Sequence, residues 1–250
     1  MIKVQSICKS FGEKVVLNKF SSTFKKGKIN LIIGKSGSGK TMTIKCMLGL
    51  HTIDSGSIFF NDQDFTVLSE YEKKELRKEI GVVFQGSALF DSMTIEENVM
   101  FPLLMLSEMS MSQMKERVYF CLKRVDLDGV YNLYPSELSG GMKKRVAIAR
   151  SIVLNPKYLF CDEPNSGLDP TTATVIDNLL KEITYEYNIT TIINTHDMNS
   201  VIEIGDNVIF IQDGQKIWSG SGDSFLNSES KQLNEFIFSS RLFQKLKSIK

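Results

Sequence analysis

The sequence lacks any apolar run long enough to cross a lipid bilayer. A membrane-spanning helix needs about 20 apolar residues, and the longest uncharged apolar stretch, residues 99–106, contains Pro102. Charged residues interrupt the N-terminus at Lys3, Lys9 and Glu13, so we expect no signal peptide. These absences exclude an integral membrane protein as an interpretation of the sequence.

The sequence also contains few cysteines and carries almost no net charge. The four cysteines, Cys8, Cys46, Cys121 and Cys161, show no paired spacing. This pattern predicts buried, reduced thiols in the cytosol and argues against a secreted disulfide scaffold. The 30 Lys and Arg residues nearly balance the 29 Asp and Glu residues. Nucleic-acid-binding proteins usually carry a strong basic excess, so we expect no nucleic-acid partner.

The 250 residues present contain a β-rich start, a helical middle and an α/β end. Alternating apolar residues predict antiparallel strands near residues 2–4 and 20–24, and residues 208–218 are typical of a hairpin. Continuous apolar or β-branched runs favour buried parallel strands, and they occupy residues 29–33, 158–161 and 189–194. Shorter strands are expected at residues 56–61 and 82–84, and helices at residues 42–50, 69–80, 114–125 and 139–154. We predict one α/β domain over residues 1–250, with a helical insertion at about 91–154 and a C-terminal extension at about 221–250.

A glycine-rich segment matches a phosphate-binding pattern. Residues 34–41 read GKSGSGKT, which fits G-x-x-x-x-G-K-[ST] after an apolar strand. The glycines let backbone N–H groups point at phosphate oxygens, Lys40 supplies positive charge, and the Thr41 hydroxyl suits Mg²⁺. The alternative is an ordinary Gly/Ser turn, and the pattern alone leaves kinases, GTPases, motors and transporters open. The predicted ATP contacts are Gly34, Lys35, Ser36, Gly37, Ser38, Gly39, Lys40 and Thr41.

Two acidic residues end a second apolar strand. The run YLFC at residues 158–161 is followed by Asp162 and Glu163. Phosphoryl-transfer enzymes hold Mg²⁺ with a carboxylate at such a strand end, which is the role we expect for Asp162. Glu163 is then placed to polarise an attacking water as a general base. The alternative, a solvated Asp-Glu turn, is disfavoured by the phosphate-binding segment.

A third motif, LSGGM at residues 138–142, gives the sequence a specific resemblance. It resembles the LSGGQ signature of ABC-type ATPases, with Met142 in place of the usual Gln. The other motifs of that family follow in order over residues 1 to about 220. They are Phe11 at the adenine-stacking position, the Walker A loop at 34–41, Gln85 in the Q-loop, Walker B at 158–163, the D-loop at 166–169 and the switch histidine at His196.

The resemblance implies both a fold and a division of roles. The fold is a P-loop NTPase of ABC type, with a mixed sheet core, an antiparallel β-rich N-terminal subdomain and a helical insertion subdomain. Gln85 and His196 then join Glu163 as catalytic residues, with His196 contacting the γ-phosphate. Thr41, Gln85 and Asp162 become the ligands of Mg²⁺. In isolation, a lone histidine after a strand, such as His196, is usually structural or solvated, and Gln85 is typical of a surface amide.

The signature segment predicts a second anion-binding site. Ser139, Gly140 and Gly141 open a helix, whose N-terminus attracts anions. In the resembled family, this segment closes on the ATP held by another subunit, so one of each motif per chain implies a head-to-tail homodimer with two ATP. Met142 leaves the serine and both glycines intact, and we expect closure to survive.

One further segment narrows the resemblance. Residues 84–104, together with LSGGM, resemble the ATPases of bacterial Mce/Mla-type phospholipid transport systems, although residues 165–168 are generic for ABC proteins. This implies transmembrane permease subunits, a Mce-domain lipid-binding protein, an accessory subunit and a place on the cytoplasmic face of the inner membrane. The alternatives are an ABC ATPase for amino acids, lipoproteins or drugs, and an ABC protein of DNA repair or translation. The latter is disfavoured because it typically carries coiled-coil insertions or two ATPase halves.

The sequence leaves more than one interpretation open for two segments. Six of the 11 methionines lie in residues 93–114, where they suit either an adaptable docking surface for a permease helix or an irregular core. The basic stripe at residues 241–250 is typical of a helix packed on its own subunit, a subunit contact or a membrane-surface contact.

Overall fold

The computed structural model describes residues 1–238, and the basic stripe at residues 241–250 lies outside that range. The chain forms two compact units. The first unit combines residues 1–68 with residues 192–238, and the second unit spans residues 69–191. Within residues 1–238, no helix has both the length and the apolar character needed to span a membrane.

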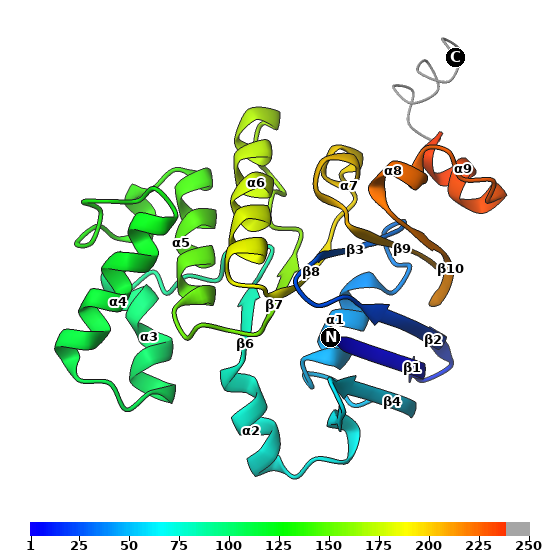
Figure 1. The fold of residues 1–250 in the computed structure, drawn as a ribbon, viewed down its shortest axis with the longest axis horizontal. Helices are drawn as coiled ribbons and strands as arrows, with labels where there is room; N and C mark the ends of the chain where they lie inside the picture. Colours follow the sequence, from blue (N-terminus) through cyan, green and yellow to red (C-terminus); the bar gives the residue numbers. More distant parts are fainter. Residues whose placement is uncertain (239–250) are drawn as a thin grey trace. The chain divides into compact units, whose positions relative to one another are not determined.

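The first unit contains a four-stranded antiparallel sheet. Its strands, in the order in which they pair, are β2 (Lys14–Phe24), β1 (Ile2–Phe11), β4 (Ser55–Phe60) and β5 (Gln63–Asp64). Ile2 lies opposite Phe24 of β2 and Phe60 of β4, and all three side chains are buried. The strong alternation at residues 2–4 and 20–24 therefore identified a real antiparallel pair, visible at the blue end of Figure 1.

A second set of strands in this unit carries the glycine-rich loop. In pairing order these strands are β10 (Gln215–Gly220), β9 (Asn207–Gln212), β3 (Ile29–Ile33) and β8 (Thr190–Asn194), the last of which begins in the second unit. Strand β3 is buried along its whole length and runs parallel to β9. Asp213 and Gly214, both with positive φ, close the β9–β10 hairpin, as the Asp-Gly pair predicts.

The helices of the first unit are short. They are α1 (Lys40–Met47), η1 (Phe65–Val67), α7 (Met198–Ile204), α8 (Gly222–Phe225) and α9 (Lys231–Ile237). The Phe236 ring of α9 stacks on Phe210 of β9, with a centroid distance of 5.0 Å. Trp218 of β10 contacts Phe225 of α8 edge to face. These aromatic contacts attach the described part of the C-terminal extension to its own unit.

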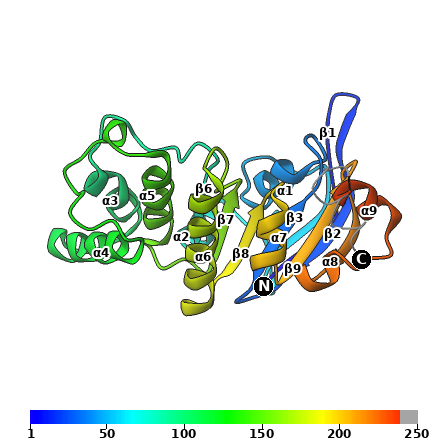
Figure 2. The same ribbon diagram turned by 90° about the horizontal axis from the view of Figure 1, so that it is seen from above.

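The second unit is mainly helical. It contains α2 (Glu70–Lys78), β6 (Ile80–Val83), α3 (Ile95–Leu106), α4 (Met111–Arg124), η2 (Pro135–Glu137), α5 (Gly140–Ile152), β7 (Tyr158–Asp162) and α6 (Pro170–Glu186). Strands β6 and β7 pair in parallel. Helices α3, α4 and α5 pack against one another, as both ribbon views show (Figures 1 and 2). Capping boxes at Ser69, Thr94 and Ser110 start α2, α3 and α4.

The methionines of residues 93–114 divide between the core and the surface. Met100 of α3 and Met114 of α4 are buried, whereas Met105, Met109 and Met111 are exposed. Met100 and Met114 therefore belong to the core, and the docking surface stays a prediction for the exposed methionines.

Several element boundaries differ from those predicted. Helix α4 begins at Met111 rather than at residue 114, because Ser110 caps it. Helix α1 covers Lys40–Met47 rather than 42–50, because Gly39 already acts as its N-cap. Helix α2 ends at Lys78 rather than near residue 80, because Ile80 begins β6. Strand β6 therefore starts two residues before the predicted strand at 82–84, and it ends at Val83.

Candidate functional site

The glycine-rich loop connects β3 to α1 within the first unit. Its backbone curls because Gly34, Gly37 and Gly39 all have positive φ, a region that glycine enters without steric cost. The loop packs tightly at two points. A Cβ at position 34 would lie 2.2 Å from the Ile211 carbonyl oxygen, and one at position 39 would lie 2.9 Å from that of Val16. These two positions therefore require glycine for space as well as for φ.

Lys40 sits inside this curl. Its ammonium donates hydrogen bonds to the carbonyl oxygens of Gly34 at 2.9 Å and Lys35 at 3.2 Å, and the residue is buried. Ser38 Oγ is also buried and has no hydrogen-bond partner among the described residues. A buried hydroxyl without a partner costs free energy unless a ligand or water satisfies it. A buried cation, an unsatisfied hydroxyl and a helix N-terminus together fit a phosphate group.

The remaining loop residues are open to solvent. Lys35, Ser36, Gly37 and Thr41 are exposed, so a ligand can reach them. Mg²⁺ usually binds proteins through one or two side chains, with the remaining ligands supplied by water and substrate phosphates. The exposed Thr41 hydroxyl is an oxygen donor that fits that chemistry.

Phe11 lies at the end of β1, in the first unit, with 46% of its surface exposed. Its ring packs edge to face against His51 at a centroid distance of 5.6 Å. The Lys9 ammonium lies 5.2 Å from the ring centroid and pairs with Asp54 at 3.0 Å. The ring is thus supported by neighbours while part of it remains accessible, as stacking on a base requires.

His196 follows β8 in the same unit. It is exposed and directly precedes Asp197, the N-cap of α7. Asp197 N donates to Thr195 Oγ1 at 3.0 Å. This bond spans His196 and restrains the backbone around it.

In the second unit, Asp162 is the last residue of β7 and Glu163 follows it, so the two acids lie at the strand end as predicted. Leu159, Phe160 and Cys161 are completely buried, and the strand ends at Asp162. Glu163 has a φ of +48°, which is an unfavourable conformation for a residue with a side chain. Ser166 N donates to the Glu163 carbonyl oxygen at 3.1 Å and closes the turn. A strained acid at a strand end is a common feature of functional sites.

The structure brings Gln85 and Glu163 together. Gln85 Nε2 donates a hydrogen bond to Glu163 Oε2 at 3.0 Å. Two residues of α5 hold the chain around Gln85. Lys144 donates to the Gln85 carbonyl oxygen, and Arg150 donates to those of Ser87 and Ala88. Burial lowers the pKa of the Lys144 ammonium, and the Glu163 carboxylate opposes that shift.

The signature residues form the N-terminus of α5. Ser139 is the N-cap, and its Oγ accepts a hydrogen bond from Met142 N at 3.2 Å. Gly140 is exposed and Gly141 is half-buried. The first N–H groups of a helix lack intrahelical acceptors, so they are available to an anion. Ser139 Oγ bonds within its own helix and does not contact Gln85 or Glu163.

Sequence reasoning missed Lys144 and Arg150, whereas it named Ser38 as an ATP contact. A signal for Lys144 was present, because it lies four residues before Ile148 on the buried face of α5. A lysine on such a face needs a partner. The identity of that partner, a backbone carbonyl 59 residues earlier, depends on tertiary packing and has no local sequence signal.

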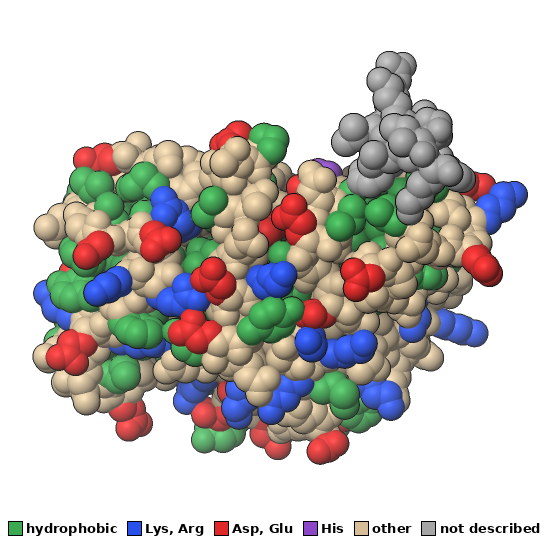
Figure 3. All heavy atoms as spheres, turned by 45° about the horizontal axis from the view of Figure 1, so that its top comes forward, with side chains coloured by type: hydrophobic (Ala, Val, Ile, Leu, Met, Phe, Trp, Pro, Cys, Tyr) green, Lys and Arg blue, Asp and Glu red, His purple; other side chains and the backbone are tan. Residues whose placement is uncertain are grey.

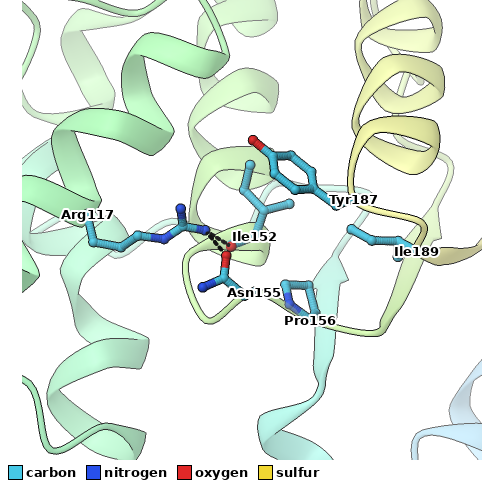
Figure 4. Close-up of a pocket in the computed structure, with 6 residues that line it drawn as sticks. All are labelled: Arg117, Ile152, Asn155, Pro156, Tyr187 and Ile189. Atoms are coloured by element: carbon cyan, nitrogen blue, oxygen red, sulfur yellow. Dashed lines mark hydrogen bonds between the residues drawn. The ribbon is translucent and has the colours of Figure 1, made fainter.

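A small cavity in the second unit lies apart from these groups. Its volume is about 130 Å³, and its lining includes Arg117, Asn155 and Tyr187 (Figure 4). Arg117 donates to the carbonyl oxygens of Ile152 and Val153 at the end of α5. Ligand sites are usually larger than about 300 Å³, so we interpret this cavity as part of the helix packing.

Comparison with known families gives a consistent result. The model of the family described as "ABC transporter" matches residues 17–166. This range includes the glycine-rich loop, Gln85, the signature residues and both acids.

Individual relatives extend the similarity to nearly the whole chain. The methionine import ATP-binding protein MetN of Campylobacter jejuni is 38% identical over 253 residues, covering 95% of this chain and 75% of the relative. The intermembrane phospholipid transport system ATP-binding protein MlaF of Haemophilus influenzae is 36% identical over 237 residues, covering 95% and 90%. The dimeric post-hydrolysis structure of the ATP-binding cassette MJ0796, bound to ADP and Pi, superimposes with a TM-score of 0.80 at 31% identity, covering 88% of this chain and 98% of that one.

Proposed function

Because this chain belongs to the ABC transporter family of ATP-binding subunits, we propose that it hydrolyses MgATP at the residues described above to drive transport of phospholipid. The ATPase activity and the use of ATP with Mg²⁺ follow from membership of the family. The single observation that carries the site assignment is the loop at residues 34–41, where buried Lys40 and the unsatisfied Ser38 hydroxyl fit a phosphate.

In the first unit, we assign substrate binding to the loop, Phe11 and His196. The loop N–H groups and Lys40 hold the phosphates, and Phe11 stacks on the base. Lys40 already has its ammonium fixed by two loop carbonyls, so little reorganisation is needed when a phosphate binds. His196 contacts the γ-phosphate and senses whether it is present.

In the second unit, we assign water activation to Glu163. Its carboxylate accepts the proton of the attacking water, and the Gln85 amide fixes the orientation of that carboxylate through the 3.0 Å hydrogen bond. Thr41, Gln85 and Asp162 would hold Mg²⁺, which supplies charge neutralisation at the phosphates. The protein's contribution is positioning and electrostatics, with no covalent intermediate.

We assign the signature residues a role at the ATP that is bound by a second copy of the chain. Cassettes of this family form dimers and work with transmembrane permeases. We assign Ser139, Gly140 and Gly141 to the γ-phosphate of the ATP held by the partner copy, since their helix N-terminus is exposed. Each dimer then holds two ATP between two chains that face in opposite directions.

The permease-docking surface is assigned to exposed apolar residues of the second unit. Leu104, Met105, Met109 and Met111 are exposed at the ends of α3 and α4. Hydrophobic side chains also appear among charged ones over the helical part of the molecule, on the left of Figure 3. Flexible methionine side chains adapt to a partner helix. This docking would place the chain on the cytoplasmic face of the inner membrane.

Phospholipid is the proposed cargo because residues 84–104 and Met142 resemble Mce/Mla-type ATPases. A Mce-domain lipid-binding protein and an accessory subunit are then expected in the complex. Methionine is the second candidate, because the methionine import relative is 38% identical. Purification of the chain with its permease in mild detergent, followed by mass spectrometry, separates the two. Copurified phospholipid and a Mce-domain protein support the proposal, and a bound amino acid with a methionine receptor refutes the phospholipid assignment.

The ATPase site is tested with the purified chain. Lys40→Met should weaken ATP binding at least about tenfold, because it removes the charge next to the phosphates. Lys45→Met is the control, because Lys45 lies in the last turn of α1, outside the phosphate loop. Isothermal titration with ATP measures both. Equal affinities in the two variants would refute the assignment of Lys40.

A further inference from the structure

The chain segment that carries Gln85 has little structure of its own. Residues 84–90 form no helix or strand, and Ser87 N bonds to the Phe84 carbonyl oxygen at 2.9 Å to close one turn. Ser87 and Ala88 have φ values of +63° and +48°. A backbone in this region is strained and keeps one conformation only where its surroundings fix it.

Helix α5 supplies that support through two cationic side chains. Arg150 donates to the carbonyl oxygens of Ser87 at 2.7 Å and Ala88 at 2.8 Å. Lys144, which is only 5% exposed, donates to the carbonyl oxygen of Gln85 itself. A lysine is rarely buried unless its ammonium has a partner. The glycine-rich loop does not explain the burial of Lys144, because the loop belongs to the first unit and Lys144 to the second.

Lys144 is connected to Glu163 through Gln85. Lys144 holds the backbone of Gln85, and the Gln85 side chain holds the Glu163 carboxylate at 3.0 Å. Lys144 and Glu163 also attract each other electrostatically. In a partly buried site this attraction is stronger than in water.

We propose that Lys144 is a positioning residue for hydrolysis, because it fixes the Gln85 backbone and so keeps the Gln85 amide hydrogen-bonded to the Glu163 carboxylate. Lys144 acts through Gln85 and does not touch the nucleotide. Since Ser139–Gly141 and Lys144 belong to one rigid helix, α5 also connects the signature residues to the water-activating acid. This inference rests on the proposed role of Glu163.

The test compares Lys144→Met, Lys144→Arg and Lys143→Met in steady-state MgATP hydrolysis by the 250-residue chain. Lys144→Met should lower kcat about tenfold through misplacement of Gln85 and Glu163, with KM for MgATP within about twofold because the loop at 34–41 is intact. Lys144→Arg keeps an N–H donor and a positive charge at this position, so it should retain most of kcat. Lys143 is the matched control, since its side chain forms no hydrogen bond or ion pair with the described residues.

A double variant separates positioning from general destabilisation. If Lys144 acts through Gln85, adding Lys144→Met to Gln85→Ala should lower kcat by less than about twofold. A full additional tenfold loss, or a loss in Lys144→Met that appears only in KM or in thermal stability, would overturn the proposal. So would unchanged amide hydrogen exchange in residues 84–90 of Lys144→Met, which we expect to be faster. Absence of MgATP hydrolysis by the wild-type chain would instead refute the proposed function, and the exchange measurement would still test the contact.

Discussion

The Cα of Gly34 faces the carbonyl oxygen of Ile211, and a methyl group on Gly34 would lie only 2.2 Å from that oxygen. The contact shows that β9 limits the space in which the chain leaves β3 and enters the phosphate loop. The loop conformation is therefore fixed by tertiary packing as well as by its glycines.

This relationship predicts different costs for two loop substitutions. Gly37→Ala should destabilise the fold by about 1–2 kcal/mol, because alanine is strained at positive φ but has nothing within 4 Å of its Cβ. Gly34→Ala should cost at least about 1–3 kcal/mol more, because the backbone must also move. Urea unfolding monitored by circular dichroism measures both. Equal midpoints for the two variants would contradict the packing argument.

The accessible ring of Phe11 predicts an effect on nucleotide affinity. Removing an aromatic ring that stacks on a base costs about 1–3 kcal/mol, so Phe11→Ala should weaken ATP binding about tenfold. Phe11→Trp should bind as well as the wild type. Val15→Ala is a suitable control, because Val15 is similarly exposed on β2. If titration of the three variants with ATP gives one affinity, Phe11 does not stack on the base.

Burial of the thiols predicts their reactivity and its pH dependence. Burial raises the pKa of Cys46 and of Cys121 to about 11 and raises that of Cys161 further. At pH 8 a thiol with that pKa is about one part in a thousand thiolate, the reactive form. Ellman's reagent should therefore label Cys8, which is half-buried, and should reach the other three only after unfolding.

The same shifts determine how stability changes in alkali. Thiols are deprotonated near pH 8.5 in the unfolded chain and only near pH 11 in the folded chain for Cys46 and Cys121. The folded state binds more protons between these values, so the free energy of unfolding should fall as pH rises from about 8.5 to 11. The decline should be smaller in Cys121→Ala, measured by urea titration at each pH. A wild-type stability that rises over this range would contradict the assigned burial.

The sequence predicted those parts of the fold that local patterns determine. Residues 29–33 were identified as a strand from their apolar run, and β3 has those bounds. Ser69 and Glu72 form the capping box that their spacing predicts. The ABC-type P-loop fold class is likewise confirmed by the family match and by the solved cassette.

The remaining features depend on residues far apart in the sequence. Helix α1 begins at Lys40 rather than at the predicted residue 42, because Gly39 packs closely against Val16 and acts as the N-cap. The contact of Lys144 with the Gln85 carbonyl joins α5 to a segment without regular structure. No periodicity or spacing in either segment specifies that pairing. The roles assigned to Gln85, Glu163, His196 and Ser139 remain proposals that rest on geometry and family.

The central claim, that two chains enclose ATP between the loop of one and the signature of the other, is tested most directly by light scattering of Glu163→Gln. This variant should bind MgATP without hydrolysing it and should then have twice the monomer mass of 28.2 kDa, reverting to a monomer without nucleotide. Gly140→Asp in the same background should bind ATP but stay monomeric, because its charge repels the partner's phosphates while its Cβ meets only Leu168 at an ordinary 3.5 Å. A Glu163→Gln chain that stays monomeric with saturating MgATP, or a dimer that Gly140→Asp leaves unchanged, would contradict the account.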